Sequence, residues 1–169
     1  SYFDARAGHY DELSGQNPAV ARARARFIRD RSIHPLPVGA ALDLGCGTGH
    51  LTRSLVSEGL ARSAIGLDVS GAMAATARLL QPEPALFAQA DATSLPFSRS
   101  AFSLVVGDSF LHHLLDPQSC LEEVRRVLAP DGVATFNEPS LRGYRFVEYL
   151  LRATFEPWDK MDPHVEDYL

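Results

Sequence analysis

Short apolar runs alternate along this chain with segments whose apolar residues recur at helical spacing. The apolar runs predict five strands, at residues 40–44, 64–69, 85–89, 102–106 and 133–136. The segments between them predict helices at residues 50–58, 70–80 and 118–128, with Ser70 as an N-cap and Pro117 before the last helix. Repeated strand-helix-strand order predicts a doubly wound α/β fold with a mostly parallel sheet, because parallel neighbours need crossover connections.

The first predicted strand runs into a glycine-rich turn, ALDLGCGTGHL, with glycines at 45, 47 and 49. Glycine permits left-handed backbone angles and close approach of a ligand, and the helix that follows offers free N–H groups to an electron-rich group. The turn therefore predicts a nucleotide site. We expect Asp131 and Gly132 to form another turn, which leads the chain into the last strand.

An aspartate stands at or near the end of each of the first four predicted strands: Asp43, Asp68, Asp91 and Asp108. Ligands of such sheets bind beyond the carboxyl ends of the strands, so the four carboxylates should meet at one rim. Any one of them, taken alone, is equally well explained as a solvated loop residue or a helix cap. The acidic rim, with no lysine or arginine in the glycine turn, disfavours pyrophosphate and favours an adenosine that carries positive charge.

Composition narrows the class of protein. The chain has 169 residues, 46% of them hydrophobic, which is enough for one domain with a real core. Its formal net charge of −5 argues against a dedicated nucleic-acid binder. Two distant cysteines suggest neither a disulfide framework nor a metal site, and no apolar run is long enough to cross a bilayer. We therefore expect a cytoplasmic protein with a small-molecule ligand, no membrane insertion and no metal.

Several motifs together resemble those of class I S-adenosylmethionine-dependent methyltransferases. They are ALDLGCGTGHLT, IGLDVS, AQADATSLPFSRSAFSLVV, SFLHHLLDP and LEEVRRVLAPDGVATFNEP, in order along residues 2–139. The glycine turn alone is shared with dinucleotide-binding folds, whereas Asp43 behind it and the Asp91-Ala92 pair make the signal specific. The resemblance is greatest to the broad branch that includes quinone-biosynthesis and natural-product enzymes.

The resemblance implies a cofactor site for S-adenosylmethionine, with S-adenosylhomocysteine as the product. The residues implied are Tyr10, Asp43, Gly45, Cys46, Gly47, Gly49, Asp68, Val69, Asp91, Ala92, Gly107 and Asp108. Asp43 and the glycine backbone would hold the methionine end, together with Gly107 and Asp108. Asp68 would bind the ribose, and Asp91 with Ala92 would bind the adenine amino group. Tyr10 would close over the cofactor from an N-terminal lid, although packing of a surface helix explains it equally well.

Three residues near the same rim are candidates for catalysis. His112 and His113 follow the fourth predicted strand and could remove a proton from an acceptor hydroxyl. Lining of the cofactor pocket is the alternative explanation for one or both. Glu138 follows the fifth predicted strand and could orient the acceptor, or could simply be a loop carboxylate before Pro139.

We expect one domain, with a helical lid at 1–35, a core at 36–139 and a helical C-terminal segment at 140–169. Five arginines, Arg22, Arg24, Arg26, Arg29 and Arg31, spread around a helix in the lid with Val20, Phe27 and Ile28 as its apolar contacts, which favours a solvated helix face. The final pair of strands typical of the family is not visible, and residues 143–155 predict an amphipathic helix instead. The fifth strand would then be a bare edge, so we hypothesise that the chain is truncated, or that a partner copy or the terminal helix covers this edge.

The sequence thus predicts an enzyme that transfers a methyl group to oxygen or carbon of a small organic acceptor. One alternative is a module that binds S-adenosylmethionine or S-adenosylhomocysteine without turnover, as part of a larger protein. Another is a nicotinamide-dependent oxidoreductase on a similar sheet, which Asp43 and the presence of histidine at position 50 disfavour.

Overall fold

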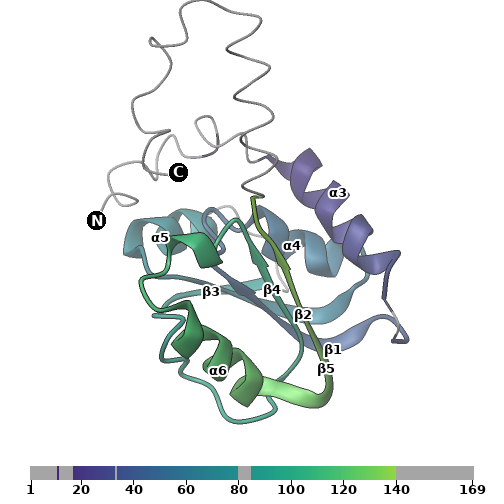
Figure 1. The fold of residues 1–169 in the computed structure, drawn as a ribbon. Helices are drawn as coiled ribbons and strands as arrows, with labels where there is room; N and C mark the ends of the chain where they lie inside the picture. The colour runs from purple at the N-terminus through teal and green to yellow at the C-terminus, as the bar shows by residue number, and fades with distance from the viewer. Residues whose placement is uncertain (1–10, 12–16, 33, 80–84, 140–169) are drawn as a thin grey trace, which may run out of the picture. The chain divides into compact units, whose positions relative to one another are not determined.

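A computed structural model describes residues 11, 17–32, 34–79 and 85–139. The chain divides into two compact units, residues 1–137 and 138–169, and the fold given below is that of the first. Its framework is a five-stranded parallel sheet in the order β3-β2-β1-β4-β5 (Figure 1). The strands are β1 Val38–Leu44, β2 Ala61–Asp68, β3 Ala85–Gln89, β4 Phe102–Asp108 and β5 Leu128–Asn137. The predicted doubly wound α/β class is confirmed.

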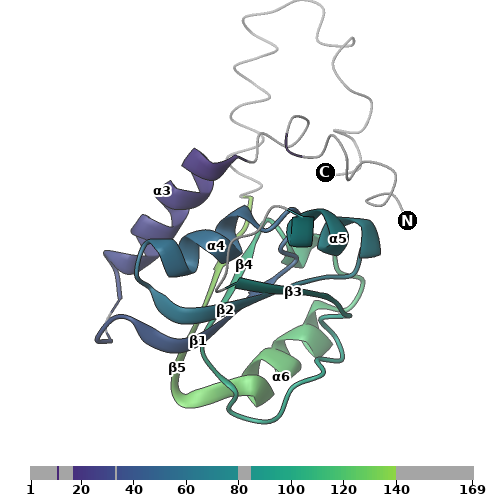
Figure 2. The ribbon, with the colours of Figure 1, turned by 180° about the vertical axis from the view of Figure 1, so that it is seen from behind.

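Helices cover both faces of this sheet. The helices are α3 Pro18–Arg29, α4 His50–Ser57, α5 Gly71–Leu79 and α6 Pro117–Val127, and a short 3-10 turn, η1, spans Leu111–His113. Figures 1 and 2 show α3, α4 and α5 on one side of the sheet and α6 on the other. Among the residues that the structure describes, no helix is long and apolar enough to cross a membrane. The helix predicted at 143–155 falls outside the described residues.

The alternation of side chains along the strands separates the core into two main layers. On the α6 side, Leu42, Leu44 and Val105 of the strands pack with three residues of that helix, Cys120, Val124 and Val127. On the α3 and α4 side, alanines alternate with larger side chains in the buried cluster: Ala25, Ala41, Leu55, Leu60, Ala61, Ala64, Leu104 and Val106. Ala25 is the residue of α3 in this cluster, so α3 joins the layer through a small side chain.

The helix starts follow local hydrogen-bonding rules. The side chain of Asn17 accepts hydrogen bonds from the backbone N–H groups of Ala19 and Val20, at 2.9 and 3.0 Å, and thereby caps α3. Ser70 accepts a hydrogen bond from the N–H of Met73 at 3.2 Å, which confirms the predicted N-cap of α5. Asp116 caps α6 through the N–H and hydroxyl of Ser119, and these bonds lower the pKa of the Asp116 carboxyl.

The last strand begins earlier than its apolar pattern predicts. β5 starts at Leu128, directly after α6, and pairs with β4 on both sides of an irregularity between the pairs Phe102–Leu128 and Leu104–Val133. Asp131 and Gly132 lie between these two pairs, in the irregular stretch that leads into the paired residues 133–137. The strand thus gains one isolated pair at Leu128, whereas continuous pairing begins at Val133, where the apolar pattern predicts it.

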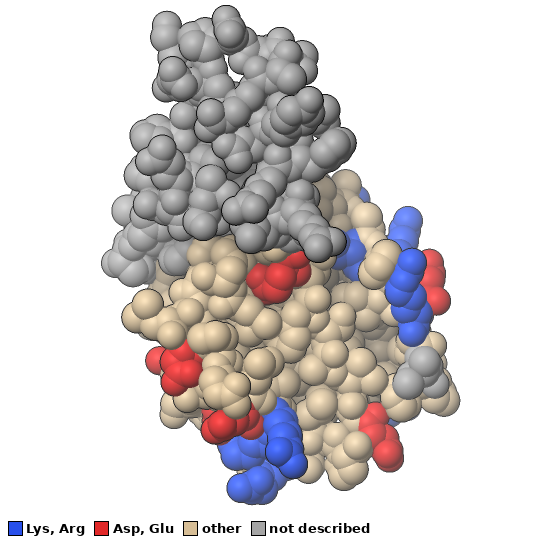
Figure 3. Space-filling view, viewed as in Figure 1, with Lys and Arg blue, Asp and Glu red and all other residues tan. Residues whose placement is uncertain are grey.

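The arginine-rich helix α3 also differs in detail from its prediction. Ala21 and Ala25 are its buried residues, whereas Phe27 is 59% exposed and has the guanidinium of Arg31 over its ring. Arg26 forms an ion pair with Glu58 of the loop after α4 at 2.8 Å. In the face drawn in Figure 3, the described basic side chains near α3 and α6 lie close to acidic ones and form no continuous stripe.

A polar brace fixes the loop between β3 and β4 against α6. Arg126 donates hydrogen bonds to the carbonyl oxygens of Phe97 at 2.6 Å and Leu95 at 2.9 Å. Glu123 accepts from Arg126 and from the N–H of Leu95, the latter at 2.7 Å. These donors stabilise the ionised carboxylate and lower the pKa of Glu123 to about 2. The brace holds in place the loop that begins with Asp91.

We expect Glu123→Gln to lower the free energy of unfolding at pH 7 by about 1 kcal/mol, because one charge-assisted bond to Arg126 is lost at a partly exposed site. Since the folded pKa of Glu123 lies below its ordinary value of 4.5, its contribution is complete above that pH and is lost as the pH falls toward 2. Denaturant titrations between pH 2 and 7 measure both effects. Glu122→Gln, on the same helix, removes the same charge; equal loss in both variants would contradict the brace.

Candidate functional site

The glycine loop after β1 is shaped by both backbone conformation and packing. Gly45 and Gly49 have φ angles of +66° and +82°, in the left-handed region that other residues rarely adopt. A Cβ atom at Gly45 would lie 2.4 Å from the ring of Phe110, and one at Gly49 would lie 2.4 Å from the ring of Phe87. The loop therefore admits no side chain at either position. Its concave side lines a small hollow of about 40 Å³.

Asp43 lies behind this loop, buried in the sheet at 1% exposure. The hydroxyl of Thr52 in α4 donates a hydrogen bond of 2.6 Å to its carboxylate. Burial removes the carboxylate from water and raises the pKa of Asp43 to about 7, although the bond from Thr52 opposes the shift and the charge of Asp68 adds to it. Asp43 is thus poised to gain or lose a proton near neutral pH, and it lines the hollow.

Asp68 joins the glycine loop to the end of β2. Its carboxylate accepts hydrogen bonds from the N–H groups of Gly47 at 2.9 Å and Ser70 at 2.8 Å. The two strands are in register here, with Asp43 opposite Gly66 and Leu44 opposite Leu67. The loop after β1 and the carboxyl end of β2 therefore form one continuous rim, as the sequence predicts.

The rim continues to β3. The N–H of Ala90 donates to the carbonyl of Asp68 at 3.0 Å, which places Asp91 next along this edge. Asp91 is exposed, and its carboxylate caps the following turn by accepting from the N–H and hydroxyl of Thr93, both at 2.8 Å. Ala92 is buried at 8% exposure and Val69 is 61% exposed. These hydrogen bonds are the ones expected if Asp91 only caps a turn, which is the alternative to a cofactor-binding role.

Asp108 ends β4 on the other side of β1. Its carboxylate accepts a hydrogen bond of 2.7 Å from the side-chain amide of Asn137 and forms an ion pair with Arg24 of α3. Gly107 before it is buried, and a Cβ atom there would lie 2.7 Å from the ring of Phe136. Asp108 and Leu51 line the hollow and also a larger groove of about 440 Å³ between α3 and the ends of β4 and β5. The structure thus brings the four strand-end aspartates to one edge.

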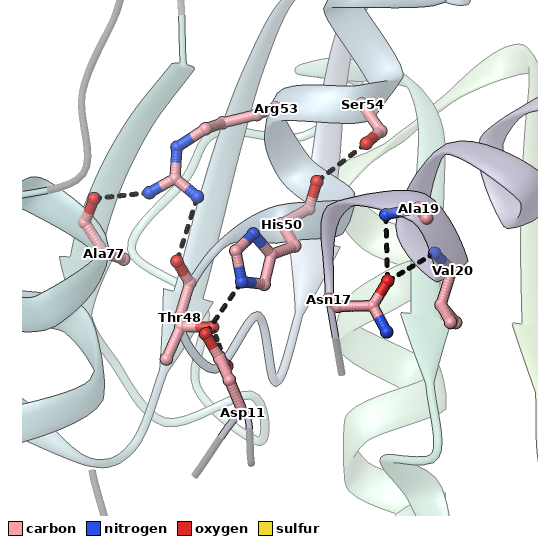
Figure 4. A network of polar contacts seen from close by, with 9 residues as sticks. All are labelled: Asp11, Asn17, Ala19, Val20, Thr48, His50, Arg53, Ser54 and Ala77. Carbon is pink, nitrogen blue, oxygen red and sulfur yellow. Dashed lines mark hydrogen bonds and ion pairs between the residues drawn. The ribbon is translucent and has the colours of Figure 1, made fainter. Parts of the chain in front are cut away.

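Asp11 adds a contact from the N-terminal segment that the sequence pattern did not identify. Its carboxylate accepts a hydrogen bond of 2.6 Å from the hydroxyl of Thr48 and lies 2.8 Å from Nε2 of His50 (Figure 4). Thr48 and His50 both line the hollow. Tyr10, which the sequence predicts to close over the cofactor, directly precedes Asp11 and lies outside the described residues. The predicted N-terminal lid contains both residues, and this was the signal in the sequence that could have pointed to Asp11.

Arg53 of α4 fixes the same loop from its other side. Its guanidinium donates to the carbonyl oxygens of Thr48 at 3.0 Å and Ala77 at 2.7 Å (Figure 4). It also lies over the ring of Phe87, 5.0 Å from the centroid. The glycine loop, α4 and α5 are therefore linked by one side chain, and burial of that side chain lowers the pKa of Arg53.

The predicted catalytic residues are placed differently from the cofactor residues. His112 and His113 lie in η1 just past β4, both exposed, with ring centroids 3.9 Å apart. Neither imidazole belongs to the described lining of the hollow or the groove. Glu138 follows β5 and is the first residue of the second unit. The positions of His112, His113 and Glu138 therefore do not assign a catalytic step to any of them.

Thiol and metal chemistry have little support in this part of the chain. Cys46 lies in the glycine loop, and burial raises the pKa of its thiol well above the usual value, so it stays protonated at neutral pH. Cys120 is buried against the sheet with its pKa raised to about 11. The described residues contain no group of three or more His, Cys, Asp or Glu side chains that could hold a metal ion.

Comparison with known proteins agrees with this geometry. A family model described as "Methyltransferase domain" matches residues 42–136, which is more than half of the chain and spans all but the start of the sheet. A malonyl-[acyl-carrier protein] O-methyltransferase of Halorhodospira halophila is 33% identical over 149 residues, covering 85% of this chain and 49% of that protein. A demethylmenaquinone methyltransferase of Lactobacillus johnsonii is 35% identical over 144 residues, covering 79% and 57%.

A solved structure gives the same result. The S-adenosylmethionine-dependent methyltransferase of Mesorhizobium loti is 31% identical and superposes with a TM-score of 0.57, covering 66% of this chain and 52% of that one. The chain spans only about half the length of the two curated relatives named above. The family match, the glycine loop after β1 and the parallel sheet agree, and the chain belongs to the class I S-adenosylmethionine-dependent methyltransferases.

Proposed function

We propose that this domain binds S-adenosylmethionine along the strand-end rim, with the hollow at the glycine loop as one part of that site, and transfers its methyl group to a small organic acceptor in the groove beside α3. The observation that carries the proposal is the position of Asp108 and Leu51, which line both spaces. A donor in the hollow and an acceptor in the groove would therefore meet at these two residues. The names of the relatives support an organic acceptor group: a malonyl group carried by acyl-carrier protein, methylated at oxygen, and demethylmenaquinone.

When bound, S-adenosylmethionine supplies an electrophilic methyl group on a sulfonium, and transfer leaves S-adenosylhomocysteine. The protein then has to align the acceptor in line with the S–CH₃ bond and keep water away. In our assignment the N–H groups of the glycine loop and the Asp43 carboxylate face the methionine end. Asp68 receives the ribose hydroxyls after giving up its bond from Gly47, and Asp91 with Ala92 contacts the adenine.

Proton removal from the acceptor is the least constrained step. His112 and His113 stay candidates for a general base, since they follow the strand that ends at Asp108 and both are exposed. An acidic acceptor would need no base at neutral pH, because it is already ionised. We therefore propose that alignment and electrostatics, rather than general-base catalysis, are this domain's main contribution.

The primary test is calorimetry of the purified chain with S-adenosylhomocysteine and, separately, with NAD. Binding of the former at micromolar or lower concentration with no response to NAD is the expected result. NAD binding without S-adenosylhomocysteine binding would reject the proposal in favour of an oxidoreductase. Incubation with methyl-labelled cofactor and a panel of acceptors then tests transfer, and binding without any transfer would identify a cofactor-holding module.

We expect Asp68→Ala to weaken S-adenosylhomocysteine binding by about 1.5–3 kcal/mol, because charge-assisted hydrogen bonds to the ribose would be lost. Asp68→Asn keeps one acceptor for the N–H of Gly47 and should recover only part of the affinity. Asp30→Ala, an exposed aspartate after α3, is the matched control. Calorimetry measures all three affinities, and an unchanged value for Asp68→Ala would rule out the ribose role.

The pKa of Asp43, about 7 in the folded chain, predicts a pH effect on cofactor binding. Below pH 7 the carboxyl is mostly neutral, and above it the carboxylate attracts the sulfonium, so affinity for S-adenosylmethionine should rise about five- to tenfold between pH 6 and 8. Asp43→Asn should give a flatter profile. S-adenosylhomocysteine, which lacks the sulfonium charge, should rise less in the wild type; equal slopes for the two ligands would contradict the assignment.

The same shift has an opposite effect on the stability of the empty protein. Because the folded pKa of Asp43 lies above its ordinary value of 3.8, its contribution to folding is complete below that pH and is lost as the pH rises through about 7. Denaturant titrations of wild type and Asp43→Asn over this window should diverge in that direction, which distinguishes the buried carboxylate from other groups that titrate.

We expect Asp11→Ala to weaken S-adenosylhomocysteine binding by about 1–2 kcal/mol, because Thr48 and His50 at the hollow lose a common partner. Asp11→Asn keeps an acceptor for the Thr48 hydroxyl and should have a smaller effect. Thermal unfolding of the empty variants should change little, since the link lies at the edge of the fold. A large loss of thermal stability with normal affinity would show instead that Asp11 has only a structural role.

A further inference from the structure

The groove beside α3 has mainly apolar walls and one basic side chain. Val20, Phe27 and Ile28 of α3 face Val106 and Phe136 of the sheet across about 440 Å³. The apolar walls suit a hydrocarbon or aromatic body. Arg24 also lines this space, next to Asp108 at the end that adjoins the hollow.

Arg24 differs from the other arginines of α3 in its surroundings. Its neighbours on the helix, Ala21 and Ala25, are buried, so this face of α3 lies against the domain. The Arg24 side chain is 30% exposed, its Nη1 atom contacts Asp108, and no hydrogen bond joins its Nε or Nη2 to another described residue. Arg26, by contrast, donates two hydrogen bonds to Glu58. Arg24 therefore brings a partly desolvated guanidinium into the groove.

Both carboxylate oxygens of Asp108 have partners, whereas the guanidinium of Arg24 has N–H donors left over. One oxygen of Asp108 accepts from Asn137 and the other faces Arg24. A guanidinium carries five N–H donors in a planar fork, and the contact with one carboxylate oxygen uses only part of that fork. Desolvation also lowers the pKa of Arg24, which reflects a cost that a second anion at the fork would offset. The groove thus offers unsatisfied donors beside an apolar cavity.

We propose that Arg24 binds an acidic group of the methyl acceptor, so that the acceptor class is an apolar molecule carrying a carboxylate. This inference rests on the proposed function. Asp108 holds the guanidinium from behind, and the remaining N–H donors of Arg24 take the carboxylate in a two-point contact. Because Asp108 also lines the hollow, the acidic end of the acceptor lies next to the donor, and its apolar body lies along Phe27 and Ile28.

The charge pattern excludes the opposite class of acceptor. A cationic group would have to approach Asp108 past the guanidinium that already neutralises it, and would be repelled by Arg24. A neutral apolar acceptor would fill the groove and displace water from Nε and Nη2 of Arg24 without replacing its hydrogen bonds, which costs free energy. A carboxylate, in contrast, accepts from both of these remaining donors at once. Arg24 is in this sense a specificity-determining residue.

The test uses octanoate and methyl octanoate as probes, titrated into the full chain saturated with S-adenosylhomocysteine. The two probes share an apolar body and differ only in the acidic group. We expect octanoate to bind at least about tenfold more tightly than its ester, and Arg24→Gln to abolish the difference. Arg24→Lys should keep part of it, because lysine retains the charge without the fork. Arg22→Gln, an exposed arginine of the same helix, should match the wild type.

Equal affinity for the two probes, or an undiminished preference in Arg24→Gln, would overturn the assignment. A second pair of ligands distinguishes the acceptor's acidic group from the donor's own carboxylate. If Arg24→Gln weakens binding of S-adenosylhomocysteine but not of 5′-methylthioadenosine, which lacks the amino-acid part, the guanidinium holds the donor and the inference is wrong. Unchanged affinity for both ligands supports it and also shows that the variant is folded.

Failure of this inference and failure of the proposed function give different results. If the wild type does not bind S-adenosylhomocysteine, both are rejected. If it binds S-adenosylhomocysteine and the octanoate preference is absent, only the acidic acceptor is rejected.

Discussion

Contact between the glycine-loop backbone and two aromatic rings is the constraint on which the site depends. Phe110 packs against Gly45 and Phe87 against Gly49, each so closely that a Cβ atom could not be inserted. Phe87 belongs to β3 and Phe110 follows β4, so the loop is held from both sides of β1. The rings fix the backbone, and the backbone then presents its N–H groups and the hollow at a defined place.

The parallel sheet uses four carboxylates in four different environments. Asp43 is buried and its pKa lies near neutrality, whereas Asp68 is bound by backbone N–H groups of the loop. Asp91 caps a turn, and Asp108 is paired with a guanidinium. A common strand-end position thus produces side chains with different charge and different availability. The fold positions the groups, and the local partners decide what each can do.

Much of this architecture could be predicted from the sequence, because it depends on local patterns. The glycine turn, the alternation of strands and helices and the Ser70 cap all follow from short stretches of chain. The early start of β5 could not be predicted, since it depends on a single pair of Leu128 with Phe102 of β4, which is distant in sequence. The contacts of Asp11 and Arg24 join residues far apart in sequence, and periodicity holds no information on them.

The orientation of α3 shows most clearly what pattern alone leaves open. Arginines at alternate positions of a helix spread around its surface, so the sequence favours a solvated face for all of them. Ala21 and Ala25 decide otherwise, because their small side chains let one face of α3 pack on the domain and carry Arg24 inward with it. The position of the Arg24 guanidinium at this groove thus depends on the packing of Ala21 and Ala25. Residues with apolar side chains thus determine where the charged group of this groove lies, and under the proposed assignment a change of acceptor in related domains would require repacking of α3 as well as replacement of Arg24.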